Sequence, residues 1–372
     1  MRYYIIAGEA SGDLHGSNLI KELKKIDPSA TIRCWGGDKM QQAGGVLVKH
    51  YRDLAFMGFS EVLINLRTIF RNLKFCKEDI LQFNPDAIIL IDYPGFNLRI
   101  AKWARQQGLK VIYYISPQVW AWKENRVKAM KKNIDKMLVI FPFEKKYFKG
   151  KWNWNVEYVG HPLVEVIERY KTQGTSNRFS DEAIVALLPG SRKQEIAKKL
   201  PVMLEVSKHF PEYQFIIAQA PSVEDSFYKT FTHGYHNVSS VKDKTYDLLM
   251  QSKAALVTSG TATLETALFE VPEVVCYRGS FLSYQIGKRV VKVKYIAIVN
   301  LIMDKPVVKE LIQHDLTVEN LKHELDRLLT NEEKIETLKK DYADLKELLS
   351  EGGNASAKAA ASINQFLNGN LR

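Results

Sequence analysis

Two short stretches of small residues stand where a protein could bind a phosphate. Each follows an apolar run typical of a buried strand, Ala254–Val257 in one case and Ala183–Leu188 in the other. Each precedes a helical pattern, so the free N–H groups and the dipole of a helix start would attract an anion there. The residues of the two turns are Ser259, Gly260 and Thr261, and Gly190, Ser191 and Arg192. Together they predict a site for a nucleoside diphosphate, although each turn alone also fits an ordinary capped helix.

Two charged side chains add chemistry to these turns. Arg192 brings a planar cation that can hold a phosphate through two N–H groups. Glu265 lies one turn inside the helix predicted from Thr261 to Phe269, where its carboxylate could accept hydrogen bonds from sugar hydroxyls. A structural role is the alternative for Glu265, because acidic residues are common in the first turns of a capped helix.

Asp92 is the candidate general base. It follows the strongly apolar strand pattern Asp86–Ile91, and ligands of open α/β sheets bind beyond the carboxyl ends of strands. A carboxylate at such a place costs desolvation energy unless it is used or well paired. The alternative is that Asp92 caps a helix predicted to start near Asn97.

The first predicted strand, Tyr3–Ala7, leads into a polar turn over residues 8–13. Its glycines do not have the G-x-G-x-x-G spacing, which argues against a nicotinamide-dependent enzyme. We expect this turn to contact a second substrate. The expected contact residues are Ser11, Gly12 and Asp13. Capping of the following helix by Ser11 or Asp13 explains the pattern equally well.

An apolar segment bordered by cations runs from Leu54 to Phe75. Its apolar residues include Met57, Phe59, Val62, Leu63, Leu66, Ile69 and Phe70, and its cations are Arg67, Arg71 and Lys74. Such a face could lie on a bilayer or receive acyl chains. A core helix with a solvated basic face is the alternative.

The charge balance indicates an anionic partner. The net charge is +11, and residues 123–151 hold ten Lys or Arg against three acids. This surface suits anionic lipid headgroups and lacks the aromatic interleaving of a nucleic-acid platform. Just before it, Trp120 and Trp122 could line an apolar pocket or simply pack. We therefore expect a membrane surface as a partner and no nucleic acid.

The chain of 372 residues predicts about two domains. A polar linker at Lys171–Asp181 divides them, so we expect domains at 1–170 and 171–345. A last helix within 346–372 would pack back on the first domain or on a partner subunit. His161, near the end of the first domain, could contact a ligand or form a hinge.

Three widely spaced cysteines, Cys34, Cys76 and Cys276, predict buried thiols in a reducing compartment. The sequence shows no signal peptide and no membrane span, so we expect a cytoplasmic protein.

Four motifs together resemble the lipid-A-disaccharide synthase family. They are Gly8-Glu-Ala-Ser-Gly-Asp13, Ser116-Pro-Gln-Val-Trp-Ala-Trp122, Leu188-Pro-Gly-Ser-Arg192 and Ser259-Gly-Thr-Ala-Thr-Leu-Glu265. The likeness extends over nearly the whole chain in the same order. It implies an α/β fold of the GT-B type, with two Rossmann-like domains whose parallel sheets face a cleft.

The resemblance also implies a reaction. An inverting glycosyltransferase of this family joins UDP-2,3-diacylglucosamine to 2,3-diacylglucosamine 1-phosphate (lipid X), giving the β-1,6-linked disaccharide 1-phosphate and UDP. It uses no cofactor and no metal, and it works at the cytoplasmic face of the inner membrane of Gram-negative bacteria. The sequence leaves a homodimer open.

Residue roles follow from the same resemblance. It assigns catalysis to Asp92, UDP binding to Arg192, a nucleotide-side role to Glu265 and an essential role to Asn300 on a late strand, Tyr295–Leu301. The N-terminal serine falls on Ser11, and the membrane patch on the segment Met57–Phe75. Two positions depart from the family pattern, namely Ala10 in place of threonine and Gly95 in place of a second acid. Gly95 weakens a mechanism that needs a carboxylate pair and leaves a single-base mechanism intact.

Three other readings stay open at this stage. Two are UDP-sugar enzymes of the same architecture, a UDP-N-acetylglucosamine 2-epimerase and a transferase acting on a polyprenyl-linked sugar. The third is a non-catalytic protein that binds membrane lipid, which would leave the paired turns and Asp92 without a purpose. UDP binding would separate this third reading from the enzymes.

Overall fold

The computed structural model describes residues 1–54, 66–174, 178–279, 293–351 and 353–369. The chain forms two compact units, which are described separately. Unit 1 comprises Met1–Pro162 together with Leu349–Arg372, and unit 2 comprises Leu163–Leu348. The C-terminal segment therefore returns to the unit in which the chain began.

Unit 1 is built on a seven-stranded parallel sheet with the order β3-β2-β1-β4-β5-β6-β7. The strands are β1 (Arg2–Ala7), β2 (Thr31–Gly36), β3 (Val46–His50), β4 (Ala87–Ile91), β5 (Val111–Tyr114), β6 (Lys136–Val139) and β7 (Glu157–Tyr158). Every residue of β4 is buried, as expected for a central strand covered on both faces.

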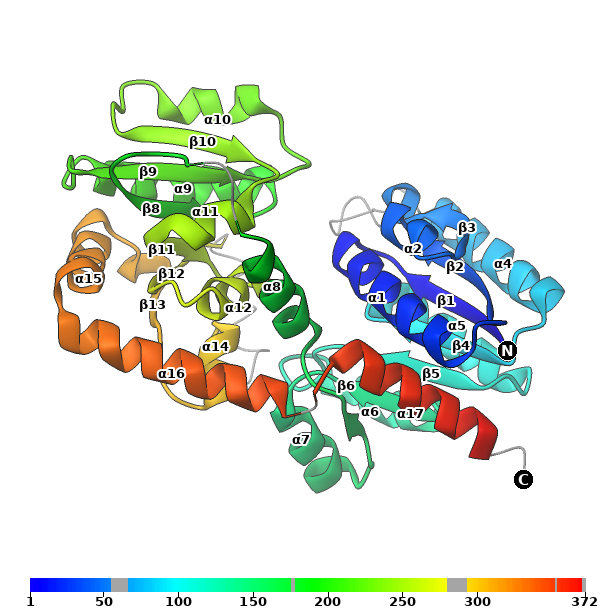
Figure 1. Cartoon of the computed structure of the whole chain (residues 1–372). Helices are drawn as coiled ribbons and strands as arrows, with labels where there is room; N and C mark the ends of the chain where they lie inside the picture. Colours follow the sequence, from blue (N-terminus) through cyan, green and yellow to red (C-terminus); the bar gives the residue numbers. More distant parts are fainter. Residues whose placement is uncertain (55–65, 175–177, 280–292, 352, 370–372) are drawn as a thin grey trace. The chain divides into compact units, whose positions relative to one another are not determined.

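Helices connect these strands (Figure 1). They are α1 (Ala10–Ile26), α2 (Asp38–Gln42), α4 (Leu66–Phe83), α5 (Pro94–Gln106), α6 (Val127–Asn133) and α7 (Pro142–Trp152), with 3-10 turns at Tyr51–Leu54 and Glu124–Arg126. The last helix, α17 (Ala355–Gly369), packs against α1. A hydrogen bond of 2.6 Å from the Ser362 hydroxyl to the Glu157 carboxylate also fastens α17 to the end of the sheet.

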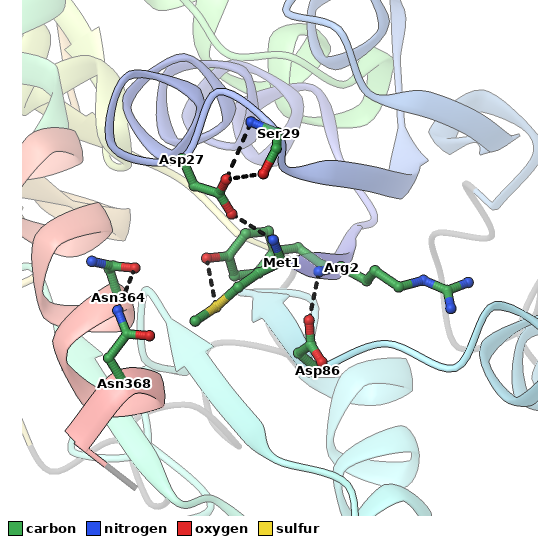
Figure 2. Close-up of polar contacts among 8 residues, drawn as sticks. Met1, Arg2, Asp27, Ser29, Asp86, Asn364 and Asn368 are labelled. Carbon is green, nitrogen blue, oxygen red and sulfur yellow. Dashed lines mark hydrogen bonds and ion pairs between the residues drawn. The ribbon is translucent and has the colours of Figure 1, made fainter. Parts of the chain in front are cut away.

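The start of β1 is held by two aspartates (Figure 2). The Met1 ammonium group lies 2.5 Å from the Asp27 carboxylate, which also accepts hydrogen bonds from Ser29. The Arg2 amide donates to Asp86, just before β4, over 2.7 Å. These contacts lie at the amino ends of β1 and β4 and do not involve the carboxyl ends of the two strands.

A second parallel sheet of six strands, with the order β10-β9-β8-β11-β12-β13, organises unit 2. The strands are β8 (Ala183–Leu188), β9 (Tyr213–Gln219), β10 (Val238–Lys242), β11 (Ser252–Thr258), β12 (Glu273–Tyr277) and β13 (Lys309–Ile312). The helices are α8 (Pro162–Gln173), α9 (Lys193–Ser207), α10 (Asp225–Thr232), α11 (Thr245–Gln251), α12 (Thr261–Leu268), α14 (Ile298–Met303), α15 (Val318–Thr330) and α16 (Glu332–Ser350), with a 3-10 turn at Gln313–Asp315.

Both sheets reverse their strand order at one point. In unit 1 the reversal lies between β1 and β4, and in unit 2 between β8 and β11. Crossover connections leave these two strands in opposite directions, so a crevice opens outside their carboxyl ends. The turns singled out from the sequence follow these four strands.

Two local predictions from the sequence were wrong, and two strands were missed. Helix α1 begins at Ala10, so Ser11, Gly12 and Asp13 lie in its first turn rather than in a loop before it. The segment Tyr295–Leu301, expected as a strand, leads into helix α14, which contains Asn300. Strands β3 and β13 were not predicted, because both are short and only partly buried.

Candidate active site

Asp92 lies directly after β4, in an unusual backbone conformation. Its φ is 43° and that of Tyr93 is 48°, so two successive residues are left-handed. The Asp92 carbonyl oxygen accepts hydrogen bonds from Asn97 Nδ2 at 2.8 Å and from the Tyr113 hydroxyl at 2.5 Å. The Asp92 N–H group donates to the Tyr114 carbonyl at 3.2 Å. Strand β5 and helix α5 thus hold a strained turn that presents one carboxylate.

The carboxyl group of Asp92 has a raised pKa. Burial raises the pKa of its carboxyl group to about 6, and the nearby Glu9 carboxylate adds to the rise. A hydrogen bond from the Tyr93 backbone opposes it in part. A carboxylate with a pKa in this range is a better proton acceptor than an ordinary aspartate and is still ionised at pH 7. The helix-cap alternative does not describe its place, because Tyr93 is the N-cap residue of α5.

The turn after β1 packs closely against Tyr93. A Cβ atom on Gly8 would lie 2.3 Å from the Tyr93 ring, so only glycine fits there. A Cβ atom on Gly12 would lie 3.0 Å from the Cβ atom of Ala7, which is a less severe conflict. Glu9 is the N-cap of α1, and Ser11 is exposed in the first helical turn. The turn after β1 therefore presents an exposed hydroxyl on Ser11 and a carboxylate on Glu9 whose charge acts on Asp92.

Asp13 has a structural partner. Its Oδ1 atom accepts hydrogen bonds from the amides of Gly37 at 2.8 Å and Met40 at 3.0 Å, and its Oδ2 atom from that of Lys39 at 3.2 Å. The carboxylate is buried and holds the start of α2. Capping is thus its observed role, although it serves the next helix rather than its own. A substrate contact for Asp13 stays a prediction.

Unit 1 contains three buried titratable groups, of which Glu144 and His15 were not found from the sequence, whereas His161 was named as a possible ligand contact or hinge. Glu144 accepts hydrogen bonds from Trp120 Nε1 at 3.2 Å and the Phe141 amide at 3.1 Å, and burial raises its pKa to about 8. Burial lowers the pKa of His15 to about 4, and its Nδ1 atom has no hydrogen-bond partner among the described residues. Burial and the neighbouring His15 lower the pKa of His161 to about 3. The sequence indicated Trp120 and His161 here, and the fold brings Glu144 to Trp120.

His161 also lies where the chain passes between the two units. Its amide donates to the Leu349 carbonyl at 3.2 Å, and the Tyr158 hydroxyl donates to the same oxygen at 3.1 Å. The chain leaves unit 1 after Pro162 and returns at Leu349. The two passages are therefore joined within unit 1.

Two cations lie close to the turn after β8, one exposed and one buried. Gly190 has a φ of 124°, and a Cβ atom there would lie 2.9 Å from Glu195 Oε2. Arg192 is the N-cap residue of α9, and its exposed guanidinium group lies 3.5 Å from Glu195 Oε1. Lys199 is buried, donates a hydrogen bond to the Thr258 hydroxyl and would lie 3.5 Å from the same Cβ atom. Burial lowers the pKa of Lys199, and Glu195 and Cys276 oppose that change.

The sequence did not reveal Lys199. It follows Lys198 on the same helix, and the residue pattern alone does not tell which of the two points inward. In the structure Lys199 links the turn after β8 to the end of β11. These are the two strands at the reversal point of the second sheet.

The turn after β11 leads into a helix that begins at Thr261, as the sequence predicted. Gly260 is the N-cap residue of α12 with a φ of 147°, a value that L side chains rarely adopt. The Ser259 hydroxyl donates to the Ile296 carbonyl at 2.8 Å, and Thr261 is exposed at the start of the helix. Glu265 accepts a hydrogen bond of 2.7 Å from the Tyr246 hydroxyl, and its burial raises its pKa.

Asn300 is buried and fully hydrogen-bonded. Its Nδ2 atom donates to the Val308 carbonyl at 2.9 Å and to Glu310 at 3.0 Å, and its Oδ1 atom accepts from the Val308 amide at 2.9 Å. Glu310 also accepts from the amides of Ile296 and Ala297. Asn300 and Glu310 therefore fix the segment that Ser259 contacts.

The predicted apolar patch is described only in part. Met57, Phe59, Val62 and Leu63 lie outside the described residues, as does the side chain of Leu66. Ile69 is partly buried against the core of unit 1, whereas Phe70 is 62% exposed. Around Phe70, the cations Arg67, Arg71 and Lys74 are exposed as well.

Two parallel sheets with the same strand order, each with glycine-containing turns at its reversal point, define an α/β protein with two Rossmann-like units. Solved structures share this fold. They include the UDP-GlcNAc 2-epimerase of Neisseria meningitidis, with a TM-score of 0.69, 13% identity and coverage of 98% of this chain and 100% of that one. The calicheamicin glycosyltransferase CalG4 has a TM-score of 0.64 and 15% identity, with 99% and 98% covered.

Sequence comparison identifies the family as well as the fold. A family model described as lipid-A-disaccharide synthetase matches residues 3–364. The lipid-A-disaccharide synthases of Geobacter sulfurreducens and Coxiella burnetii are 38% and 36% identical to this chain. The alignments cover 98% of this chain in both cases, and 97% and 98% of the relatives. The chain belongs to the lipid-A-disaccharide synthase family.

Family membership confirms the resemblance seen in the four motifs. It also confirms the predicted fold class and the prediction of a glycosyltransferase of lipid A disaccharide synthesis. The alternative of an epimerase is not favoured, because the epimerases share the fold at only about 13% identity.

Proposed function

We propose that this chain transfers a diacylglucosaminyl group from UDP-2,3-diacylglucosamine to the 6-hydroxyl group of 2,3-diacylglucosamine 1-phosphate. The observation that carries the proposal is Asp92, an aspartate with a pKa of about 6 at the reversal point of a sheet in a chain of the synthase family. The products are the β-1,6-linked disaccharide 1-phosphate and UDP.

Asp92 is the general base of this mechanism. Its carboxylate accepts the proton of the acceptor 6-hydroxyl, and that oxygen attacks the anomeric carbon of the donor from the face opposite UDP. The bond from the anomeric carbon to the UDP oxygen breaks, so the configuration inverts. Gly95, exposed with no atom within 4 Å of a Cβ position, supplies no second acid, which fits a single base. In this mechanism unit 1 binds the acceptor, and Ser11 is an exposed contact residue in the first turn of α1.

Unit 2 is the donor side. Positively charged and N–H groups at Ser191, Arg192 and Thr261 hold the diphosphate and stabilise the charge that develops as UDP leaves. Lys199 adds a buried cation beneath the turn that contains Gly190. Glu265 binds sugar hydroxyls rather than reacting, and Asn300 acts by positioning the segment held by Ser259.

Because both proposed substrates carry acyl chains, we expect the protein to bind them at a membrane surface. Arg67, Phe70, Arg71 and Lys74 are all exposed on α4 at spacings of three and four residues, so they share one helix face. An exposed aromatic ring among cations suits an anionic bilayer. Among the described residues, no helix has the length and apolar character needed to cross a membrane. We include peripheral binding at the cytoplasmic face of the inner membrane in the proposal, with homodimer formation as an open part of it.

Product formation tests the proposed function. Purified chain is mixed with UDP-2,3-diacylglucosamine and 2,3-diacylglucosamine 1-phosphate in mixed micelles, and disaccharide and UDP are followed together. The proposal expects both products in equal amounts. Folded protein that binds UDP but makes no disaccharide would contradict it and return attention to a different acceptor.

The pH dependence of kcat/KM should report the titration of Asp92. The base is active when ionised, so the rate should be constant above its pKa of about 6 and should fall about tenfold for each pH unit below it. The measurement is the pH profile of kcat/KM for the wild type between pH 4.5 and 8. A profile without an inflection between about pH 5 and 7 would remove Asp92 from the role of base.

A further inference from the structure

A cavity of about 300 Å³ opens beside the Asp92 turn in unit 1. Helix α5 forms one wall and helix α6, with the preceding 3-10 turn, forms the other. The lining residues are Pro94, Gly95, Leu98, Arg99, Ala101, Lys102, Arg126, Ala129, Met130, Asn133 and Ile134. The size is at the lower end of the range for small-molecule sites, so the cavity suits one polar group and part of a sugar rather than two acyl chains.

The cavity contains three cations and no acid. Its charged lining residues are Arg99, Lys102 and Arg126. None of them forms an ion pair with another of the described residues, although most other arginines of the described part do. Burial lowers the pKa of Lys123, and the positive charge of Arg126 lowers it further. The charge of Arg126 therefore acts on at least one neighbouring cation. Three neighbouring cations without an acid form a site that favours an anion.

One side chain, that of Tyr113, contacts the Asp92 turn and lies within the electric field of Arg126. The Tyr113 hydroxyl donates to the Asp92 carbonyl, and the Tyr113 side chain is wholly buried. Burial raises the pKa of Tyr113, the charge of Asp92 adds to this rise, and the charge of Arg126 opposes it. Pro94 and Gly95, which line the cavity, follow Asp92 by two and three residues. A molecule in the cavity would therefore lie close to the proposed base.

Gly95 keeps this cavity free of negative charge. It is exposed, and no atom lies within 4 Å of the position that a Cβ atom would take. An acidic side chain would fit there, and it would face the three cations. Glycine at this place leaves the cations available to an external anion.

We propose that this cavity binds the phosphate group of the sugar phosphate acceptor, with Arg126, Arg99 and Lys102 as its ligands. One guanidinium group can bind two oxygens of the same phosphate. The apolar side chains of Leu98, Met130 and Ile134, which also line the cavity, would contact the adjoining face of the sugar. The inference rests on the proposed function for the identity of the acceptor. Binding of the phosphate here would orient the sugar toward Asp92.

Two variants test the site. Arg126→Ala removes a ligand, and Gly95→Asp adds an acid in open space. Each should raise the KM for the phosphorylated acceptor about tenfold, with kcat within twofold and UDP affinity unchanged. The KM for the same acceptor without its phosphate should not change. Lys21→Ala, an exposed cation of α1 outside the cavity, is the matched control and should alter none of these values.

Separate measurements keep the inference apart from the proposed function. Titration with glucosamine 1-phosphate should show binding to the wild type and to Lys21→Ala, and a loss of at least tenfold in affinity for Arg126→Ala. This result supports the inference even if the wild type makes no disaccharide. An unchanged KM for the phosphorylated acceptor in both variants would overturn it while leaving the reaction in place.

A membrane phosphate is the other source of the same chemistry. Vesicles of phosphatidylglycerol and phosphatidylcholine distinguish the two, because the inference expects equal vesicle binding by the wild type and Arg126→Ala. Loss of vesicle binding together with an unchanged acceptor KM would assign the cavity to a lipid headgroup and overturn the inference. Thermal unfolding of each variant shows that an altered KM does not reflect loss of folded protein.

Discussion

Replacing Asp92 with asparagine should lower kcat/KM by about 10²–10⁴-fold and leave UDP affinity unchanged. Asparagine has nearly the same shape and tolerates the left-handed backbone at a φ of 43°. The Asp92 carbonyl would keep its hydrogen bonds from Asn97 and Tyr113, because these involve the backbone. The variant therefore removes the proton acceptor and little else. Initial rates at saturating donor and a UDP titration measure the two quantities.

The control for this experiment lies at the other end of the same strand. Asp86 precedes β4 and accepts a hydrogen bond from the Arg2 amide, which an asparagine oxygen can also accept (Figure 2). Asp86→Asn should therefore retain the wild-type rate. If Asp92→Asn also retained it, the base would have to be another group, and Glu9 would be the first to examine because its charge already acts on Asp92.

The sequence predicted strands best where they are central. The predicted bounds of Ala183–Leu188 match β8, and those of Asp86–Ile91 differ from β4 by one residue. Both are continuous apolar runs, because a central parallel strand is covered by helices on both faces. The segment Tyr295–Leu301 has the same apolar character but is partly helical, since a short apolar run does not by itself distinguish a strand from a buried helix.

The candidate site was predictable where local sequence determines it. The residue pattern predicted a turn followed by a helix at Gly190 and at Gly260, and glycine allows the positive φ values that the two turns have. Lys199, Glu144 and His15 were missed because each acquires its surroundings from residues distant in the sequence, such as Thr258 for Lys199. Asp13 shows the converse. Its type suggested a cap or a ligand contact, and only the packing of α1 against α2 brings it to the amides that it binds.

Replacing Arg192 with alanine should raise the dissociation constant of UDP by about 10–100-fold. The guanidinium group is exposed at the start of α9, and a 3.5 Å contact with Glu195 holds it beside the turn that contains Gly190. A charged hydrogen bond to a phosphate would be lost, together with a fixed cation that stabilises the departing diphosphate. We therefore expect kcat to fall as well. Calorimetric titration with UDP and steady-state rates measure these effects.

The series UDP, UMP and uridine locates the interaction on the phosphates. Arg192→Ala should weaken UDP most, UMP less and uridine not at all, because uridine presents no charge to the guanidinium group. Arg192→Lys keeps the charge without the two-pronged geometry and should lie between the wild type and alanine. The neighbouring Lys193 is the matched control, because it pairs with Glu224 at 2.5 Å, and Lys193→Ala should bind UDP normally. Equal weakening of UDP and uridine by Arg192→Ala would show that the substitution disturbs the start of α9 rather than a phosphate contact.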